Sequence, residues 1–140
     1  MQTVRPAVLF NYVGPSTVDG NYLNQLMRAT VAGKPNPPVT QAKLDKRGFL
    51  SFAFDGRYKF ARYYAPTAFN TPQTLEEILK NNDVQLFDLE NDPDEIHNLT
   101  LEPEKNRATI LRMNGVLNEL MAKEVGVNDG SFLPEDIRPK

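Results

Sequence analysis

The sequence predicts an α+β fold in which a small antiparallel sheet of about four strands is packed by a long C-terminal helix. An Asp-Gly pair at residues 55–56 separates two aromatic-rich runs, which is the pattern of a β-hairpin over residues 47–65. A further alternating run at 84–89 predicts another strand. Apolar residues then recur at helical spacing over about 103–125.

The composition is that of an ordinary globular chain of one-domain size, with 140 residues, 40% of them hydrophobic, and a net charge of −2. The basic residues are scattered, which argues against nucleic acid as a partner. No apolar run reaches the roughly 18 residues of a membrane span, and the N-terminus lacks a signal-peptide pattern. We therefore expect a soluble chain with no membrane partner, in a compartment that the sequence leaves open.

Two residue types limit the chemistry. The chain has no cysteine and one histidine, His97. Disulfides, cysteine-based metal sites and two-histidine metal sites are therefore excluded. His97 itself follows a turn without an obvious nucleophile beside it, which favours a structural or exposed role over that of a general base.

The first part of the chain predicts a short strand and a helix. Residues 7–13 form an apolar run that Gly-Pro-Ser ends, and residues 18–32 show helical spacing of apolar side chains. Ser16 or Thr17 is a candidate N-cap for this helix. Asp19 would then lie in the first turn, where the helix dipole favours an acidic residue.

A proline-rich segment follows at residues 33–45, and we expect an irregular surface loop. Four basic residues, Lys34, Lys43, Lys46 and Arg47, make this region locally positive. It would attract an anionic ligand such as a sulfate or phosphate ester. The alternative is an ordinary charged loop.

The hairpin is the clearest signal in the sequence. A type I′ turn needs positive φ at both central residues, which suits Asp55-Gly56. Phe52 and Phe54 share one strand face, and Lys59 alternates with the aromatic residues of the returning strand. At this spacing, core or cross-strand packing is favoured over a ligand-stacking face.

Two helices complete the prediction. Residues 72–81 predict a short one, with Thr71 as its cap and Pro72 at its first position. In the long helix over 103–125, five apolar residues fall on one side and predict the face that packs on the sheet. These are Ile110, Met113, Leu117, Leu120 and Met121.

An acidic turn lies between the last strand and the long helix. Its carboxylates are Asp88, Glu90, Asp92, Asp94 and Glu95. An EF-hand counted from Asp88 would need glycine at its sixth position and a carboxylate at its twelfth, where this chain has Pro93 and Leu99. A solvated turn is therefore favoured over a metal site. The Asn98-Leu99-Thr100 triplet also fits the N-glycosylation pattern.

Two segments of the chain resemble sulfatases of the alkaline phosphatase superfamily. Residues 55–63, DGRYKFARY, resemble the "RYKYIRY"-type strand near the C-terminus of those enzymes. Residues 85–99, QLFDLENDPDEIHNL, are similar to their "ELYDLENDPGExxNL" segment, which a helix follows. The resemblance covers about residues 47–124.

The resemblance implies an arylsulfatase-like C-terminal subdomain at 47–125, with a tail at 126–140. Residues 1–46 would link it to a catalytic domain that this chain lacks. In the family that domain carries a formylglycine, made within C/S-x-P-x-R, and a calcium ion. Here no serine is followed by P-x-R, so no catalytic residue, metal ligand or cofactor is carried over. The resemblance also makes Lys34, Lys46 and Arg47 candidates for the rim of the substrate pocket.

What does carry over is a structural motif. It consists of Tyr58, Lys59, Leu86, Asp88, Leu89, Asp92, Pro93, Asn98 and Leu99. The expected partner is the catalytic domain, or a second copy bound through an exposed sheet face. The alternatives are a stand-alone interaction module, or the tail of a phosphonate or phosphate monoester hydrolase of the same superfamily.

Overall fold

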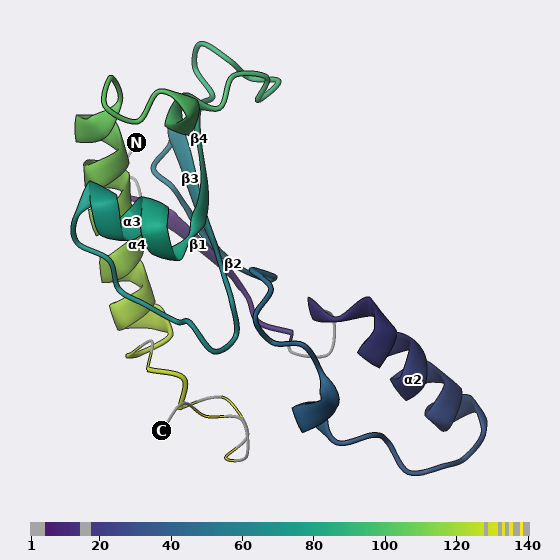
Figure 1. The fold of residues 1–140 in the computed structure, drawn as a ribbon. Coiled ribbons are helices and arrows are strands. Elements are labelled where there is room, and N and C mark those ends of the chain that lie inside the picture. Colours follow the sequence, from purple (N-terminus) through teal and green to yellow (C-terminus); the bar gives the residue numbers. More distant parts are fainter. Residues whose placement is uncertain are drawn as a thin grey trace.

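The sheet that the sequence predicts is present and antiparallel throughout. A computed structural model describes residues 5–14, 18–127, 129–131, 133, 135 and 138. Over these residues the strand order is β1-β2-β3-β4, so each strand pairs with the next one along the chain (Figure 1). The strands are β1 (Val8–Tyr12), β2 (Phe49–Phe54), β3 (Tyr58–Tyr64) and β4 (Asp83–Asp88). The predicted α+β class is confirmed.

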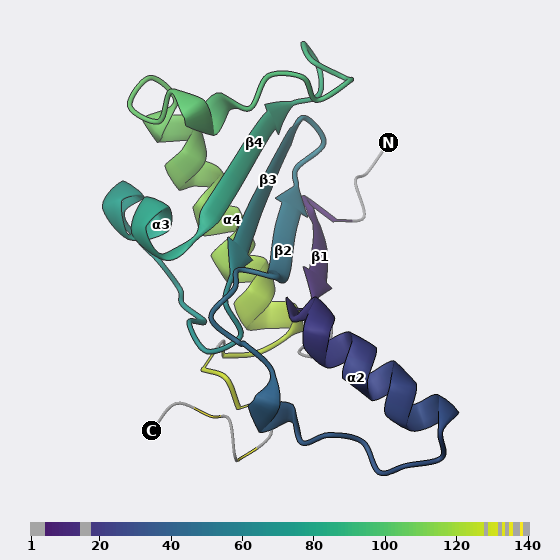
Figure 2. The same ribbon diagram turned by 45° about the vertical axis from the view of Figure 1, so that its right-hand side comes forward.

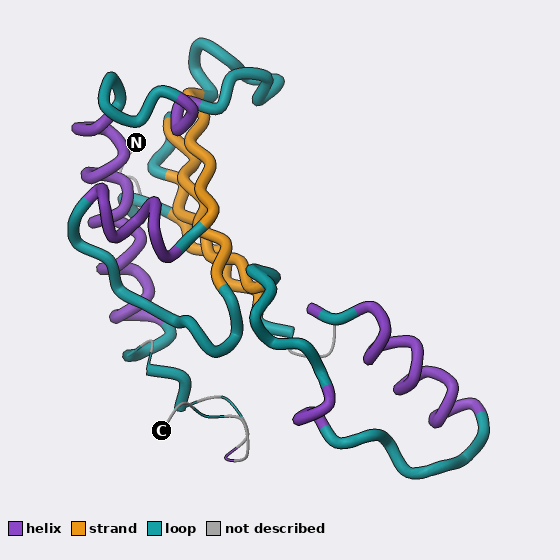
Figure 3. Tube along the Cα trace, viewed as in Figure 1, coloured by secondary structure: helices purple, strands orange, loops and turns teal. Residues whose placement is uncertain are grey.

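The helices cover only one face of this sheet. The long helix α4 (Arg107–Glu124) and the short α3 (Leu75–Asn81) pack on it together (Figure 2). Helix α2 (Gly20–Val31) projects from the end of the sheet, on the side away from α4 (Figures 1 and 3). Two 3₁₀ turns, η1 (Val39–Gln41) and η2 (Leu99–Leu101), lie in the connecting loops. In the described part of the chain, none of the helices has the length and apolar character of a membrane span.

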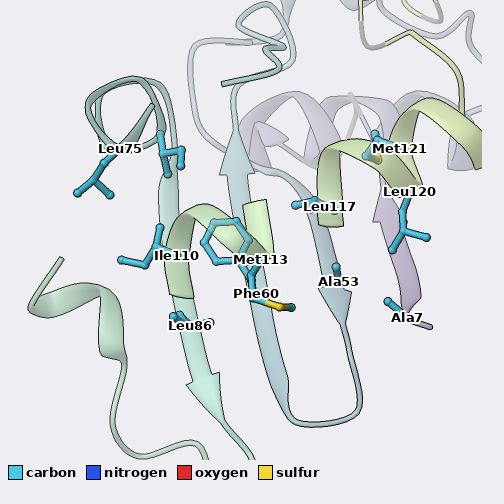
Figure 4. Close-up of a cluster of buried hydrophobic side chains, with 11 residues drawn as sticks. Ala7, Ala53, Phe60, Leu75, Leu86, Ile110, Met113, Leu117, Leu120 and Met121 are labelled. Atoms are coloured by element: carbon cyan, nitrogen blue, oxygen red, sulfur yellow. The ribbon is translucent and has the colours of Figure 1, made fainter. Parts of the chain in front are cut away.

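The main core lies between α4, α3 and the inner face of the sheet. All five apolar residues predicted on the long helix are buried, which confirms that stripe (Figure 4). From the sheet they meet Ala53, Phe60 and Leu86, and α3 adds Leu75 and Ile78. Side chains alternate along a strand, so one residue in two from each strand enters this core.

The N-terminal strand belongs to the same sheet as the hairpin. β1 pairs with β2 in the register Val8↔Phe54 to Tyr12↔Leu50. It lies before residue 46, in the segment that the resemblance treats as a link. Leu133, from the expected tail, is buried beside Phe49 and Tyr64. Strand β1 and Leu133 therefore both contribute to the packing of the subdomain.

The predicted helix starts need correction. Helix α3 begins at Leu75, and Thr74, not Thr71, is its N-cap. The Thr74 side chain accepts from the Glu77 backbone N–H while the Glu77 carboxylate accepts from the Thr74 N–H, which is a capping box. For α2 the N-cap is Asp19, whose carboxylate accepts from Asn21 N at 2.9 Å. The proposed caps Ser16 and Thr17 lie outside the described residues.

The long helix begins later than predicted. It starts at Arg107, four residues after Pro103, because η2 and a turn occupy the intervening chain. The Asn106 side chain donates to the carbonyls of Leu99 (2.9 Å) and Glu102 (3.1 Å). These bonds satisfy the turn's backbone acceptors before the helical pattern starts.

The hairpin turn also differs from the prediction. Gly56 has φ +98°, but Asp55 does not have positive φ, so the type I′ geometry is wrong. The Asp55 carboxylate instead accepts from the backbone N–H groups of Arg57 (3.0 Å) and Tyr58 (2.7 Å). Asp55 closes the turn through its side chain, which removes the need for a left-handed backbone at that residue.

Candidate functional site

The two segments that resemble sulfatase motifs lie next to each other in the sheet. They form β3 and β4, in the register Tyr58↔Asp88, Lys59↔Phe87 and Phe60↔Leu86. The acidic turn follows β4 directly and lies beyond the end of the hairpin (Figure 1). We call this region, the hairpin turn together with residues 86–100, the clasp.

The first tie in the clasp joins the hairpin turn to the end of β4. Arg57 donates from Nε to Asp88 Oδ1 at 2.9 Å and from Nη2 to Asp88 Oδ2 at 2.7 Å. This bidentate geometry is the strong form of the arginine–carboxylate pair. The Arg57 guanidinium holds the pKa of the Asp88 carboxyl well below its usual range. Asp88 is therefore ionised at neutral pH, and its oxygens are already bonded.

A second tie joins β3 to the acidic turn. The Lys59 ammonium pairs with the Glu95 carboxylate, and it lies 5.7 Å from the centre of the Phe87 ring. Glu95 is a non-glycine residue with positive φ, at 56°. Asp92 accepts from the backbone N–H groups of Ile96 (3.1 Å) and His97 (2.7 Å), which lowers its pKa. The turn thus uses its carboxylates to hold its own shape.

A third tie comes from Asn98. Its Oδ1 accepts from Leu86 N in β4 at 3.0 Å and from Thr100 N at 3.1 Å. It caps η2 and at the same time binds that turn to the edge strand. The Thr100 hydroxyl adds a bond to the Val84 carbonyl at 2.9 Å. Asn98 is half-buried, so these are structural contacts.

The clasp does not have the arrangement of a catalytic or metal site. The His97 side chain is 78% exposed, and its Nδ1 lies 3.7 Å from Asp92. In the part of the chain that the structure describes, no three histidine, aspartate or glutamate residues gather to hold a metal ion. Three of the residues that resemble the sulfatase motif, Lys59, Asp88 and Asn98, act here as ties between chain segments.

The opposite face of the sheet is the most distinctive surface of the molecule. No described helix covers it (Figure 2). On the edge strand, Val8, Phe10 and Tyr12 are 56%, 45% and 43% exposed. The Phe10 and Phe52 rings stack with their centres 5.0 Å apart. We call this surface the open face; its residues are Val8, Phe10, Tyr12, Leu50, Phe52, Phe54, Lys59, Ala61, Tyr63, Gln85 and Phe87.

The three predicted rim residues lie at different places. Lys34 is exposed and follows the end of α2 that is farthest from the sheet (Figure 1). Arg47 is at the base of β2, where it binds Asp83 at 2.6 Å and the Lys80 carbonyl at 2.7 Å. Lys46 is exposed beside it. The structure therefore brings Lys46 and Arg47 together without Lys34, and their role at a rim stays a prediction.

A large hollow of about 790 Å³ lies between residues 5–7 and α4. Charged groups line it, and two pairs of them are bonded: Arg112 Nη1 binds Asp55 Oδ2 at 2.8 Å, and Arg5 lies 3.4 Å from Glu124. Glu119 and Lys123 line it as well. None of the described residues that line it is a serine, threonine, tyrosine or histidine.

A row of three polar residues, two of them buried, was not predicted from the sequence. Asn11, Ser51 and Arg62 lie in register across β1, β2 and β3 on the inner face, and Ser51 Oγ donates to Asn11 Oδ1 at 2.6 Å. Asn114, from α4, faces this row and accepts from Arg62 Nη1 at 2.7 Å. The signal was present, because alternation from Phe60 places Arg62 on the buried face.

No family model matches the sequence, and no curated protein matches it.

Proposed function

We propose that this chain is the C-terminal subdomain of an arylsulfatase-like sulfatase. Its role would be structural and would include bordering the substrate pocket. Catalysis would belong to a separate domain with the formylglycine and calcium. The observation that carries the proposal is the clasp: the segments that resemble two sulfatase motifs occupy neighbouring strands, and their polar residues tie those strands to the turn.

Three carboxylates of the acidic turn, Asp88, Asp92 and Glu95, do not have the arrangement of a calcium site. Asp88 is bonded to Arg57, Glu95 to Lys59, and Asp92 to two backbone N–H groups. Calcium takes six to eight oxygen ligands, several of them carboxylate oxygens that are free to turn toward the ion. These carboxylates are already held by other groups of the chain.

The open face supports a docking role toward a catalytic domain. Exposed apolar patches on a soluble surface mark places where another protein surface packs. The stacked pair Phe10–Phe52 and the exposed Val8 and Tyr12 form such a patch. Helix α2, which projects from the end of the sheet on the side away from α4 (Figure 1), carries two further exposed apolar residues, Met27 at 58% and Val31 at 90%. A larger domain seated there would cover both surfaces.

A second candidate function is a stand-alone interaction module. The same open face could be covered by a second copy of the chain, since β1 is an edge strand of the sheet that the described residues form. The exposed apolar edge favours this candidate as much as the first. Sedimentation separates them, because only the module requires self-association.

The test is complementation in trans. A sulfatase catalytic domain with its formylglycine formed, cut before its own C-terminal sheet, is mixed with this chain and assayed on an aryl sulfate with calcium. We expect no turnover by this chain alone, binding between the two pieces, and higher activity of the mixture. Aryl phosphate in a parallel assay reports the phosphate-hydrolase alternative.

Two matched variants locate the binding surface. Phe10→Lys places a charge on the open face, whereas Leu101→Lys does so at an 80% exposed position of η2. We expect only Phe10→Lys to weaken binding. Turnover of aryl sulfate by this chain alone would contradict a non-catalytic role. Equal binding by both variants would exclude the open face as the docking surface.

A further inference from the structure

Arg62 is a buried cation whose charge the described residues do not balance. The residue is 3% exposed, in the middle of β3 on the inner face. Burial lowers the pKa of Arg62 to about 10, so the guanidinium still carries its charge at neutral pH. Among the described residues, no carboxylate pairs with it. A buried charge without a counter-ion is costly, so this position needs an explanation.

Two asparagines hold the guanidinium in place. Arg62 Nη1 donates to Asn114 Oδ1 at 2.7 Å and to Asn118 Oδ1 at 2.6 Å. The orientation of both amides is fixed, because each Nδ2 donates to the Pro72 carbonyl, at 2.8 and 2.9 Å. These bonds use one nitrogen of the guanidinium. Nε and Nη2 have no hydrogen-bond partner in the described part of the chain, which leaves three of the five arginine donors unused.

A cavity lies beside Arg62. It measures about 200 Å³, between the C-terminal half of α4 and the loop before α3. Arg62, Asn118 and Thr71 line it with polar groups, and Met121 and Val127 line it with apolar ones. Water occupies about 30 Å³ per molecule in the liquid, so the volume accepts a small polyatomic ion. None of the described residues that line the cavity is acidic.

The neighbouring tyrosine does not supply the missing charge. The Tyr64 hydroxyl is buried without a hydrogen-bond partner within the described residues. Burial raises its pKa, so Tyr64 remains a neutral phenol at neutral pH. It lines an adjoining cavity of about 130 Å³, which shares Met121 and Val127 with the first. A neutral phenol cannot balance the charge of the guanidinium. Among the described residues, Arg62 therefore still has no counter-ion.

We propose that Arg62 is the centre of an oxyanion-binding site, which takes a carboxylate, sulfate or phosphate group in the cavity beside Asn118 and Thr71. The planar guanidinium presents Nε–H and Nη2–H side by side, and this pair matches two oxygens of such a group. Thr71 also lines the cavity, and its hydroxyl is a possible further donor to the bound group. Asn114 and Asn118 are positioning residues that hold the arginine. This inference does not depend on the proposed function.

The test is a titration of the folded chain followed by NMR of the arginine Nε–H resonances. Sodium sulfate, sodium phosphate and sodium acetate are added in separate series, with sodium chloride at matched ionic strength. We expect a saturable shift of the Arg62 resonance with at least one oxyanion and none with chloride. Acetate reports carboxylates, and the other two salts report tetrahedral oxyanions. Arg112, exposed and paired with Asp55, is the internal control in each titration.

A variant that leaves Arg62 intact tests whether the oxyanion binds in this cavity. Ala122 is exposed and lines the cavity, so Ala122→Phe narrows it without removing a core side chain. We expect this variant to keep its amide spectrum and to bind the oxyanion at least about tenfold more weakly, equivalent to about 1.4 kcal/mol. Shifts that grow linearly and equally with chloride, or unchanged binding by Ala122→Phe, would overturn the proposal.

Discussion

Arg57 binds both carboxylate oxygens of Asp88, and this pair joins the turn of the hairpin to the end of the last strand. A backbone hydrogen bond joins the same two segments, because Leu89 N donates to the Arg57 carbonyl at 2.9 Å. Asp88 also accepts from the Asn91 side chain at 2.8 Å. One carboxylate therefore organises the exit of β4 and the start of the acidic turn.

This pair makes the folded chain sensitive to acid. The pKa of Asp88 is lower in the folded chain than the value of about 3.9 expected when it is unfolded. The unfolded state therefore binds the proton first, and the pair's stabilisation is present above about pH 4. It is lost as the pH falls through the folded-state pKa. We expect urea midpoints to fall between about pH 5 and about pH 2, and the fall to be smaller in Asp88→Asn.

A nearby carboxylate provides the control for this effect. Asp94 lies in the same turn and is exposed. Asp94→Asn changes the same formal charge without touching Arg57, so its acid dependence should match that of the unaltered chain. If both variants lose the same part of the acid dependence, general charge repulsion explains it and the Arg57–Asp88 pair does not.

Asn98 should matter through its side-chain oxygen. Asn98→Ala removes the acceptor for Leu86 N and Thr100 N, and leaves these partly buried donors unsatisfied. We expect a loss of about 1–3 kcal/mol in the free energy of unfolding, measured by urea denaturation. Asn98→Asp keeps the acceptor and should retain more of the stability at neutral pH. Equal losses in the two variants would assign the effect to the amide's donor group instead.

The apolar periodicity of the sequence predicted much of the fold. The spacing from Ile110 to Met121 identified the buried side of α4, and the aromatic alternation placed β2 and β3. These patterns are local, so the sequence reveals them directly. Which face of the sheet stays open depends on where α4 and α3 pack, and that is a tertiary property.

The polar features were harder to predict because their partners are far apart in sequence. Arg62 meets Asn114 from a position 52 residues away, and Arg57 meets Asp88 across 31 residues. A single sequence does not give such pairings. The capping box of α3 is different: Thr74 and Glu77 are three residues apart and fit a local signature. The sequence prediction instead used the preference of proline for the first helical position, and so it placed the helix start at Pro72.

The corrected cap of α3 gives a test with an internal control. Thr74→Ala removes the oxygen that accepts from Glu77 N at 3.2 Å, and we expect a loss of about 1 kcal/mol in stability. Thr71→Ala should leave the helix start unchanged, since Thr71 lies before the cap. Thermal or urea unfolding of the two variants decides between the positions. A larger loss for Thr71→Ala would support the prediction made from the sequence.

Two glycines should respond to alanine in opposite directions. Gly56 has φ +98°, a conformation that L-residues rarely adopt, so Gly56→Ala should cost about 1–2 kcal/mol even though no atom lies within 4 Å of the added Cβ. Gly115 lies inside α4, is exposed and has the same free space. Gly115→Ala should therefore add up to about 1 kcal/mol through helix propensity.

Urea midpoints of both glycine variants, read at constant slope, measure the two effects in one experiment. Neither added Cβ has a neighbouring atom within 4 Å, so packing does not distinguish the two sites. Opposite signs of the change in the free energy of unfolding would therefore report the backbone conformation. Stabilisation by Gly56→Ala would mean that the turn relaxes to negative φ when a Cβ is present. In that case the Asp55 carboxylate alone, through its bonds to Arg57 N and Tyr58 N, would be sufficient to close the hairpin.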